Sequence, residues 1–220
     1  MSRYDAVLLD AFGTLIDLDE PSVRLRSSVL RHLGVEVSAA DAARASLAET
    51  VYYAAHCHEG SDEIALAGLR ARCAEIVLRE LGIDEDPARA AALLRDSIAF
   101  RVFPDVEPLL TGLHRAGVAV AVVSNWDCSL PEALDGVGIT VDLVLDSASS
   151  GSSKPDPGIF RRALATLGVE PRRALHIGDT EETDGAGARA AGVDVRILHR
   201  GAVPAAPGTI TALTDVLALL

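Results

Sequence analysis

Five apolar runs alternate with helix-patterned segments, and this alternation constrains the fold more than any other feature of the sequence. The runs extend over residues 4–9, 118–123, 141–145, 173–177 and 193–198. Continuous apolar runs of this length are typical of strands that are buried on both faces. Because segments with the length and periodicity of helices separate the later runs, we predict an α/β fold with a parallel five-stranded sheet and right-handed crossovers.

Residues 16–100 interrupt the alternation, because they contain helical patterns and no strand-like run. Ser38, Ser61 and Asp86 are the predicted starts of the second, third and fourth helices. The four predicted helices extend over residues 21–34, 38–58, 61–82 and 86–100. We therefore predict an inserted all-α helical cap domain over residues 16–100, and an α/β core formed by residues 1–15 and 101–220. Both ends of the insertion must return to the first strand, so its helices are expected to lie over the crevice at that strand's carboxyl end.

The rest of the core is predicted to supply the helices that cover the sheet. These helices extend over residues 105–116, 130–134, 158–167, 184–191 and 209–220. A Ser-rich loop at 147–153 follows the third strand, and a Pro/Ala-rich loop at 201–208 precedes the last helix.

Charge and composition exclude several classes of protein. The net charge of −12 argues against binding to nucleic acid, which needs a basic face. No apolar run approaches the length of a membrane span, and no charged-then-apolar leader precedes the first strand. The three cysteines have spacings that fit neither a zinc site nor a disulfide framework. We therefore expect free thiols, a cytoplasmic location and no membrane or nucleic-acid partner, while the oligomeric state is left open.

Polar side chains follow four of the predicted strands. They are Asp10 with Thr14, Ser124 with Asn125, Lys154, and Asp179 with Asp184. Parallel strands point their carboxyl ends in one direction, so these groups are expected to converge in one crevice. Carboxylates in such a place can act as nucleophile or as ligands of Mg²⁺, which also takes substrate phosphate. The set predicts a site for a small anionic substrate.

Lys154 is the one lysine in the chain, since the other 19 of 20 basic residues are Arg. A compact ammonium is a point charge, whereas a guanidinium is a planar fork. The exception to the use of Arg indicates that a point charge is needed at this position.

This arrangement resembles the haloacid dehalogenase superfamily of aspartate-nucleophile hydrolases. The matching motifs are DAFGTL from Asp10, Ser124-Asn125, Lys154-Pro155, and GDTEETD from Gly178 to Asp184. Their order and strand-end placement cover the whole predicted α/β core. The resemblance implies a Rossmann-like core, and the helical insertion is similar to the C1 type of cap in that superfamily.

The resemblance also implies a role for each matching residue. Asp10 would attack the substrate and form a covalent aspartyl intermediate that water then hydrolyses. Ser124 and Lys154 would hold the transferring group. Thr14 would face the same crevice as a further catalytic group, and Asn125 would bind the substrate. Asp10, Asp179 and the backbone carbonyl of Phe12 would ligate Mg²⁺. Asp184 would support the metal shell or Lys154.

Phe12 departs from the phosphatase pattern. Phosphatases of this superfamily usually carry a second Asp two residues after the nucleophile, where it protonates the leaving oxygen and later activates water. General acid–base help of this kind is worth about 10² to 10⁴ in rate. Phe12 indicates a leaving group that needs little protonation, another proton donor, or low activity.

An aromatic residue at this position also resembles the 2-haloacid dehalogenases, in which halide leaves without a proton and no metal is needed. Arg44 would then bind the substrate carboxylate. The acidic GDTEETD segment favours metal and phosphate chemistry instead, because paired acids would repel a carboxylate substrate. Mg²⁺-dependent phosphatase activity on a small phosphorylated metabolite is the main hypothesis. The alternatives are a metal-independent 2-haloacid dehalogenase and a catalytically weak binding or regulatory homologue.

Other residues that resemble site residues are interpreted by position. Trp126 follows Asn125 and is expected at the mouth of the crevice, in contact with substrate. His176, inside the fourth strand, is predicted to be a core histidine. Packing is the favoured interpretation of the cluster of Tyr52, Tyr53, His56 and His58, and the alternative is that they line a substrate pocket on the lower face of the insertion.

Overall fold

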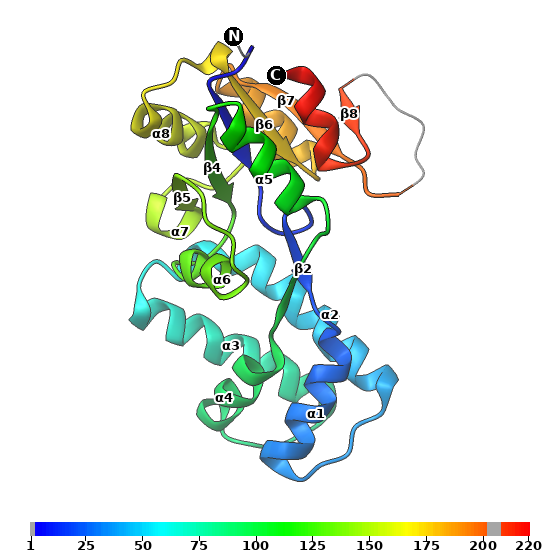
Figure 1. The fold of residues 1–220 in the computed structure, drawn as a ribbon. Coiled ribbons are helices and arrows are strands. Elements are labelled where there is room, and N and C mark those ends of the chain that lie inside the picture. The colour runs from blue at the N-terminus through cyan, green and yellow to red at the C-terminus, as the bar shows by residue number, and fades with distance from the viewer. Residues whose placement is uncertain (1–2, 202–207) are drawn as a thin grey trace.

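The computed structural model describes residues 3–201 and 208–220 of the chain. Most of the predicted Pro/Ala-rich loop at 201–208 therefore lies outside the described residues. Across the described ranges, no helix is both long and apolar enough to cross a membrane. Figure 1 places the sheet with its flanking helices at one end and the helical insertion at the other.

The core sheet has six parallel strands in the order β5-β4-β1-β6-β7-β8. The strands are β1 (Ala6–Leu9), β4 (Ala119–Ser124), β5 (Leu143–Asp146), β6 (Ala174–Gly178), β7 (Asp194–Leu198) and β8 (Thr209–Ile210). The five predicted strands and the parallel α/β fold are confirmed. The sixth strand, β8, was missed because its two residues are too few to show a period, and it adds only an edge beside β7.

Strand β1 lies in the middle of the sheet, which explains its uninterrupted apolar sequence. Leu9 is paired with Val122 of β4 on one side and with Ile177 of β6 on the other. All four residues of β1 are fully buried because helices cover both faces of the sheet. The residue that follows, Asp10, therefore emerges between the carboxyl ends of β4 and β6.

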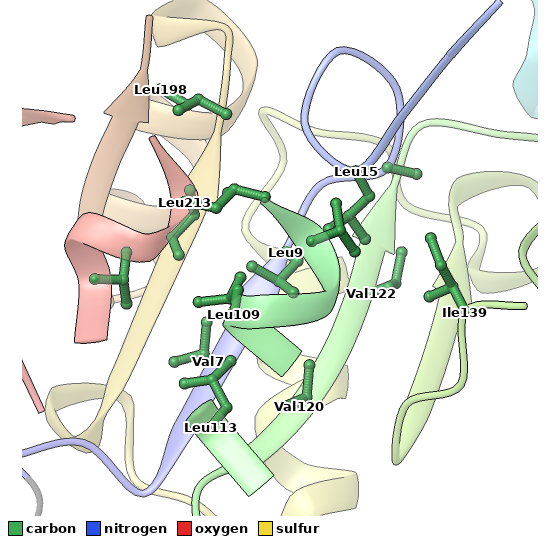
Figure 2. Close-up of a cluster of buried hydrophobic side chains, with 14 of the residues drawn as sticks. Val7, Leu9, Leu15, Leu109, Leu113, Val120, Val122, Ile139, Leu198 and Leu213 are labelled. Carbon is green, nitrogen blue, oxygen red and sulfur yellow. The ribbon is translucent and has the colours of Figure 1, made fainter. Parts of the chain in front are cut away.

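One face of the sheet packs against α5 (Val106–Arg115) and the 3₁₀ helix η4 (Leu213–Leu219). Figure 2 shows this cluster, in which Leu109 and Leu113 of α5 face Val7 and Leu9 of β1. A second apolar cluster on the opposite face includes residues of α8 (Gly158–Leu167) and α9 (Ala186–Ala190). The sheet is thus the middle layer of three.

Four long helices form the insertion: α1 (Pro21–Leu33), α2 (Ala39–His56), α3 (Glu63–Leu81) and α4 (Pro87–Ser97). They share a hydrophobic cluster of their own, separate from the two clusters of the sheet. The short elements are η1 (Cys57–Glu59), α6 (Leu130–Gly136), α7 (Ser147–Ser150), η2 (Pro171–Arg173) and the π-helix η3 (Glu181–Gly185). The domain boundaries given by the sequence stay a prediction.

Two short strands correct the expectation that residues 16–100 hold no strand. β2 (Ile16–Leu18) and β3 (Phe100–Val102) pair antiparallel where the chain leaves and re-enters the core. An Asp17–Arg101 ion pair at 2.5 Å joins them. The predicted fourth helix therefore ends at Ser97 instead of Phe100, because Phe100 is the first residue of β3. Three-residue strands are too short to show a pattern in sequence.

Four smaller differences from the predicted elements are found. Helix α3 is capped by Asp62 and not started by Ser61, since the Asp62 carboxylate accepts from the backbone N–H groups of Ile64 and Ala65. The predicted loop at 147–153 begins with the short helix α7, and the predicted helix at 184–191 is η3 followed by α9. The predicted last helix at 209–220 is β8 followed by η4.

Candidate active site

Asp10 is the first residue after β1, and its carboxylate is held by two neighbours. Its Oδ1 accepts a hydrogen bond of 2.9 Å from Ser124 Oγ at the end of β4. The same oxygen accepts from Lys154 Nζ at 2.5 Å. Among the described residues, no hydrogen bond is found at the other oxygen, Oδ2. The structure therefore brings Asp10, Ser124 and Lys154 together, as the sequence predicts.

Lys154 bridges two carboxylates in a buried position. Its ammonium donates to Asp10 Oδ1 at 2.5 Å and to Asp184 Oδ1 at 2.6 Å, and the residue is 5% exposed. Burial on its own would lower the pKa of Lys154, but the charges of Asp10 and Asp184 outweigh it and raise the pKa. The ammonium is therefore held in its charged form.

Asn125 holds Lys154 through the backbone. Its side-chain Nδ2 donates to the Lys154 carbonyl at 2.9 Å, and its Oδ1 accepts from the Lys154 N–H at 2.8 Å. These two bonds use both polar atoms of the amide. Asn125 is predicted to bind substrate, and its observed contacts make it a positioning group for the lysine.

Asp184 sits in the π-helix η3 and receives hydrogen bonds from three sides. Besides Lys154, its Oδ1 lies 2.9 Å from His176 Nε2, and its Oδ2 accepts from the Thr180 N–H at 3.2 Å. Burial on its own would raise the pKa of Asp184, but the Lys154 ammonium and the His176 hydrogen bond hold it below its usual range. Asp184 is thus an anion in the folded protein at neutral pH.

His176 is a buried core histidine, as the sequence predicts, but its contact with Asp184 is not part of that prediction. It is fully buried, with Nδ1 3.1 Å from the Leu8 carbonyl and Nε2 against Asp184. The signal was a lone polar residue inside the apolar strand β6, two positions before Gly178. A buried imidazole needs partners for its nitrogens, and at that distance from the strand end one partner falls in the site.

Gly13 and Gly178 make room for the acidic side chains. A Cβ at Gly13 would lie 2.2 Å from Asp179 Oδ2, and Gly13 also has a φ of +76°. A Cβ at Gly178 would lie 2.1 Å from the Asp184 carboxyl carbon. Both glycines of the sequence motifs therefore permit a close approach that any side chain would prevent.

Three carboxyl groups meet at this edge of the sheet. Oxygens of Asp10, Asp179 and Asp184 lie within 4.8 Å of one another. Burial raises the pKa of Asp10 against the effect of Lys154, and burial together with the charges of Asp10 and Asp184 raises the pKa of Asp179. Crowded anionic oxygens of this kind fit a hard divalent cation such as Mg²⁺, which takes carboxylate, water and phosphate ligands. The donor set therefore suits the predicted metal.

A cavity of about 410 Å³ extends from this edge of the sheet into the helical insertion. Phe12, Asn125 and Trp126 line it on the core side, while residues of α1, α2, α3 and α4 line it on the other. Phe12 is 37% exposed and Trp126 is 5% exposed, with their ring centroids 6.4 Å apart. Asp10 is not among the described residues that line the cavity, so the cavity opens beside the carboxylate and not around it.

Two predicted site residues, Thr14 and Arg44, do not line the cavity and have no contact with the carboxyl cluster among the described residues. Thr14 is fully buried, and its Oγ1 has no hydrogen-bond partner among the described residues. Arg44 is exposed on α2, where it forms ion pairs with Asp41 at 2.8 Å and Glu80 at 3.4 Å. The guanidinium is thus engaged on the outer surface of the insertion.

Tyr53 and Trp126 meet at the wall of the cavity. Tyr53 lines the cavity and donates from its hydroxyl to Asp127 Oδ2 at 2.8 Å. Its ring meets Trp126 edge-on at 6.2 Å. The two residues join helix α2 to the loop that follows β4.

A parallel three-layer α/β core with a carboxylate, an ammonium and an acidic pair at one strand edge defines a Rossmann-like, hydrolase-type site. A family model described as haloacid dehalogenase-like hydrolase matches residues 4–192. The chain therefore belongs to the haloacid dehalogenase-like hydrolase family.

Several relatives resemble parts of the chain. Haloacid dehalogenase-like hydrolase domain-containing protein 3 of Bos taurus is 44% identical over 96 residues, which are 43% of this chain and 38% of that protein. Phosphoserine phosphatase of Thermus thermophilus is 37% identical over 143 residues, which are 63% of this chain and 57% of that enzyme. The matches thus span well under two thirds of these relatives' lengths.

A solved structure resembles the chain over nearly its whole length. A defluorinating L-2-haloacid dehalogenase has a TM-score of 0.76 and 26% identity, and the match covers 98% of this chain and 94% of that one. The magnesium-bound putative hydrolase YfnB of Bacillus subtilis has a TM-score of 0.75, 17% identity and 99% coverage of both chains, which supports the fold alone.

Proposed function

We propose that this protein is a Mg²⁺-dependent phosphohydrolase that acts on a small phosphorylated metabolite, with Asp10 as the nucleophile. One observation carries the proposal: three carboxyl groups share the site with a single ammonium. Without a further cation, an anionic substrate would be repelled. Magnesium would be held by Asp10, Asp179 and Asp184 with the Phe12 carbonyl, and it would supply positive charge at the transferring phosphoryl group.

The chain's own residues then have defined tasks. Asp10 Oδ2 forms a bond to phosphorus as the bond to the ester oxygen breaks, while Ser124 and Lys154 fix the carboxylate through Oδ1. Water then attacks phosphorus, releasing phosphate and regenerating the carboxylate. Asn125 holds Lys154 in place. Because Phe12 cannot donate a proton, the departing alkoxide takes one from solvent. Relatives such as the phosphoserine phosphatase of Thermus thermophilus support phosphate-ester chemistry.

A metal-independent 2-haloacid dehalogenase is the second candidate. Phe12 favours it, because halide leaves without a proton, and so does the likeness to the defluorinating dehalogenase. The surface ion pairs of Arg44 weigh against the role that this candidate gives to Arg44. A cytoplasmic location remains part of the proposal, supported by the three free cysteines.

A paired assay separates the candidates. The protein is given a generic phosphate monoester or a 2-haloacid, each with Mg²⁺ and with a chelator. Phosphate release that stops with chelator is the expected result. Halide release that is indifferent to chelator would replace the proposal with the dehalogenase. No turnover of either substrate by folded protein would leave a binding or regulatory homologue.

A further inference from the structure

The cavity beside the site is mostly apolar and is built from one stripe of each surrounding helix. Ser46, Glu49 and Tyr53 line it from α2, at a spacing of three to four residues. Helices α3 and α4 add stripes in the same way. The lining residues from these two helices are Arg70, Cys73, Val77, Ala91, Leu94, Arg95 and Ser97.

Glu49 differs from the other carboxyl groups of this lining, because it is buried and, among the described residues, no hydroxyl or basic side chain contacts it. Glu49 is only 9% exposed. Its carboxyl group interacts with the thiol of Cys73, and no basic side chain pairs with it among the described residues. Burial raises its pKa to about 7, so a large share of the group is ionised at neutral pH. A buried carboxyl without a counter-ion lacks a partner that a ligand can provide.

Aromatic rings form the wall of the cavity towards the core. Trp126 is the centre of this group, with ring centroids 5.4 Å from Phe100, 6.2 Å from Tyr53 and 6.4 Å from Phe12. Faces of aromatic rings attract cations, most strongly where water is excluded. A carboxyl group and several rings around one cavity together suit an organic ammonium group.

We propose that Glu49 is a specificity-determining residue that binds a protonated amine on the alcohol part of the substrate. The inference deepens the proposed function and rests on it, since it names the leaving group of the phosphate ester. The substrate class is thus an aminoalkyl phosphate, with the phosphate at Asp10 and the ammonium in the cavity.

The other charged residues of the cavity leave this role to Glu49. Asp127 is 3% exposed but already accepts from Tyr53 and from the Ser129 hydroxyl. Arg70 and Arg95 are exposed, so water screens their repulsion of a cation inside. Glu132 is exposed as well. A buried carboxylate interacts far more strongly with a nearby charge than a solvated group does.

An ammonium in the leaving group also fits Phe12. A nearby positive charge withdraws electron density from the ester oxygen, so the departing alkoxide is more stable and needs less help from a general acid. Phe12, which cannot donate a proton, and Glu49, which selects an amine, are thus consistent with one substrate.

Binding of two matched ligands tests the inference. 2-Aminoethylphosphonate and ethylphosphonate cannot be hydrolysed as phosphate esters are, and they differ only in the amine. Calorimetry with Mg²⁺ at pH 7.5 should show at least tenfold tighter binding of the aminated ligand. Glu49→Gln, which keeps an acceptor for the Cys73 thiol, should remove that preference. The exposed α3 variant Glu75→Gln should retain it.

Two further measurements keep the outcomes distinct. Glu49→Asp, whose carboxylate is shorter by one methylene group, should retain part of the preference. It serves as the second variant if Glu49→Gln is poorly folded. Turnover of phosphoethanolamine and ethyl phosphate is measured in parallel. Equal binding of both phosphonates, or of neither, overturns the inference, and so does a preference that survives Glu49→Gln. Turnover of both esters without preference leaves the proposed function intact, whereas amine-selective binding without turnover contradicts the proposed function alone.

Discussion

Lys154 contacts two buried carboxylates at 2.5 and 2.6 Å, and this spacing limits what can replace it. Arginine keeps the charge but adds volume in a closed site. We expect Lys154→Arg to lower the free energy of unfolding by about 1–3 kcal/mol, as for other overpacked sites, and to reduce turnover. Urea unfolding and steady-state kinetics measure the two effects. Unchanged turnover would show that any cation suffices at this position.

Phe12 marks the place where the phosphatases that this chain resembles have an acid. Because its side chain is 37% exposed and lines the cavity, a carboxyl group can be accommodated there. We expect Phe12→Asp to raise phosphate release by at least about tenfold, below the full 10² to 10⁴ of an optimised general acid. Phe12→Asn is the control, because it has similar size and no acidic proton. Equal rates for the two variants would contradict the prediction.

Glu49 should also make stability depend on pH. The unfolded value of its pKa is 4.5 and the folded value is about 7, so the unfolded chain loses the proton first. Below pH 4.5 the carboxyl group is neutral in both the folded and the unfolded state, so it does not affect stability. Between pH 4.5 and 7 the free energy of unfolding falls as pH rises. Above pH 7 the loss of stability caused by this group is complete. The shift corresponds to about 3 kcal/mol at most.

Glu49→Gln removes this titration. Its free energy of unfolding, compared with that of the parent, should increase by a few kcal/mol between pH 5 and pH 8. Denaturant titrations at the two pH values measure the change, with Glu75→Gln as the exposed control. A difference that is constant with pH would show that the buried carboxyl does not titrate in this range.

At the scale of the elements, the cap of α3 offers a direct comparison of neighbouring residues. Asp62 Oδ1 accepts two backbone N–H bonds of 2.9 Å, and Ser61 caps nothing. Asp62→Ala should destabilise the protein by about 0.5–2 kcal/mol, and Ser61→Ala by much less. Thermal unfolding of the two variants decides between the capping residues, and a larger loss at Ser61 would reverse the assignment.

Elements with enough residues to show a period could be predicted from the sequence, and shorter ones could not. The core strands were found because burial on both faces makes each a continuous apolar run. The pair β2 and β3, with three residues each, shows no such pattern, and Phe100 was therefore added to a helix. Strand β8 was missed for the same reason.

The candidate site divides along similar lines. Asp10, Ser124, Lys154 and Asp184 were found because parallel strands carry their ends to one edge, whatever the loops do. Glu49 could not be found, since its burial depends on how three helices pack. The prediction for Arg44 rests on its approximate distance along the chain from Asp10, and that distance does not determine the face of a helix on which a residue lies.

On the scale of the whole molecule, the acidic cluster should link metal binding to stability. A cation bound by the folded state alone stabilises it in proportion to the logarithm of its concentration. We expect millimolar Mg²⁺ to raise the melting temperature by a few degrees, as for about 1 kcal/mol in a chain of this size. Asp179→Asn should lose the increase, and sodium chloride of equal ionic strength should not reproduce it. If the melting temperature of Asp179→Asn still rises with Mg²⁺, the metal binds elsewhere.

The antiparallel ribbon of β2 and β3 brings together the two places where the chain enters and leaves the helical insertion. Leu18 lies opposite Phe100, so the two crossing points are neighbours in one ladder. If recombination exchanged residues 19–99 between relatives, both junctions would lie next to each other in this ribbon. Since the proposed amine-binding residue, Glu49, lies within this exchanged segment, a chimaera joined at β2 and β3 is expected to change the substrate preference and keep the residues at the strand edge.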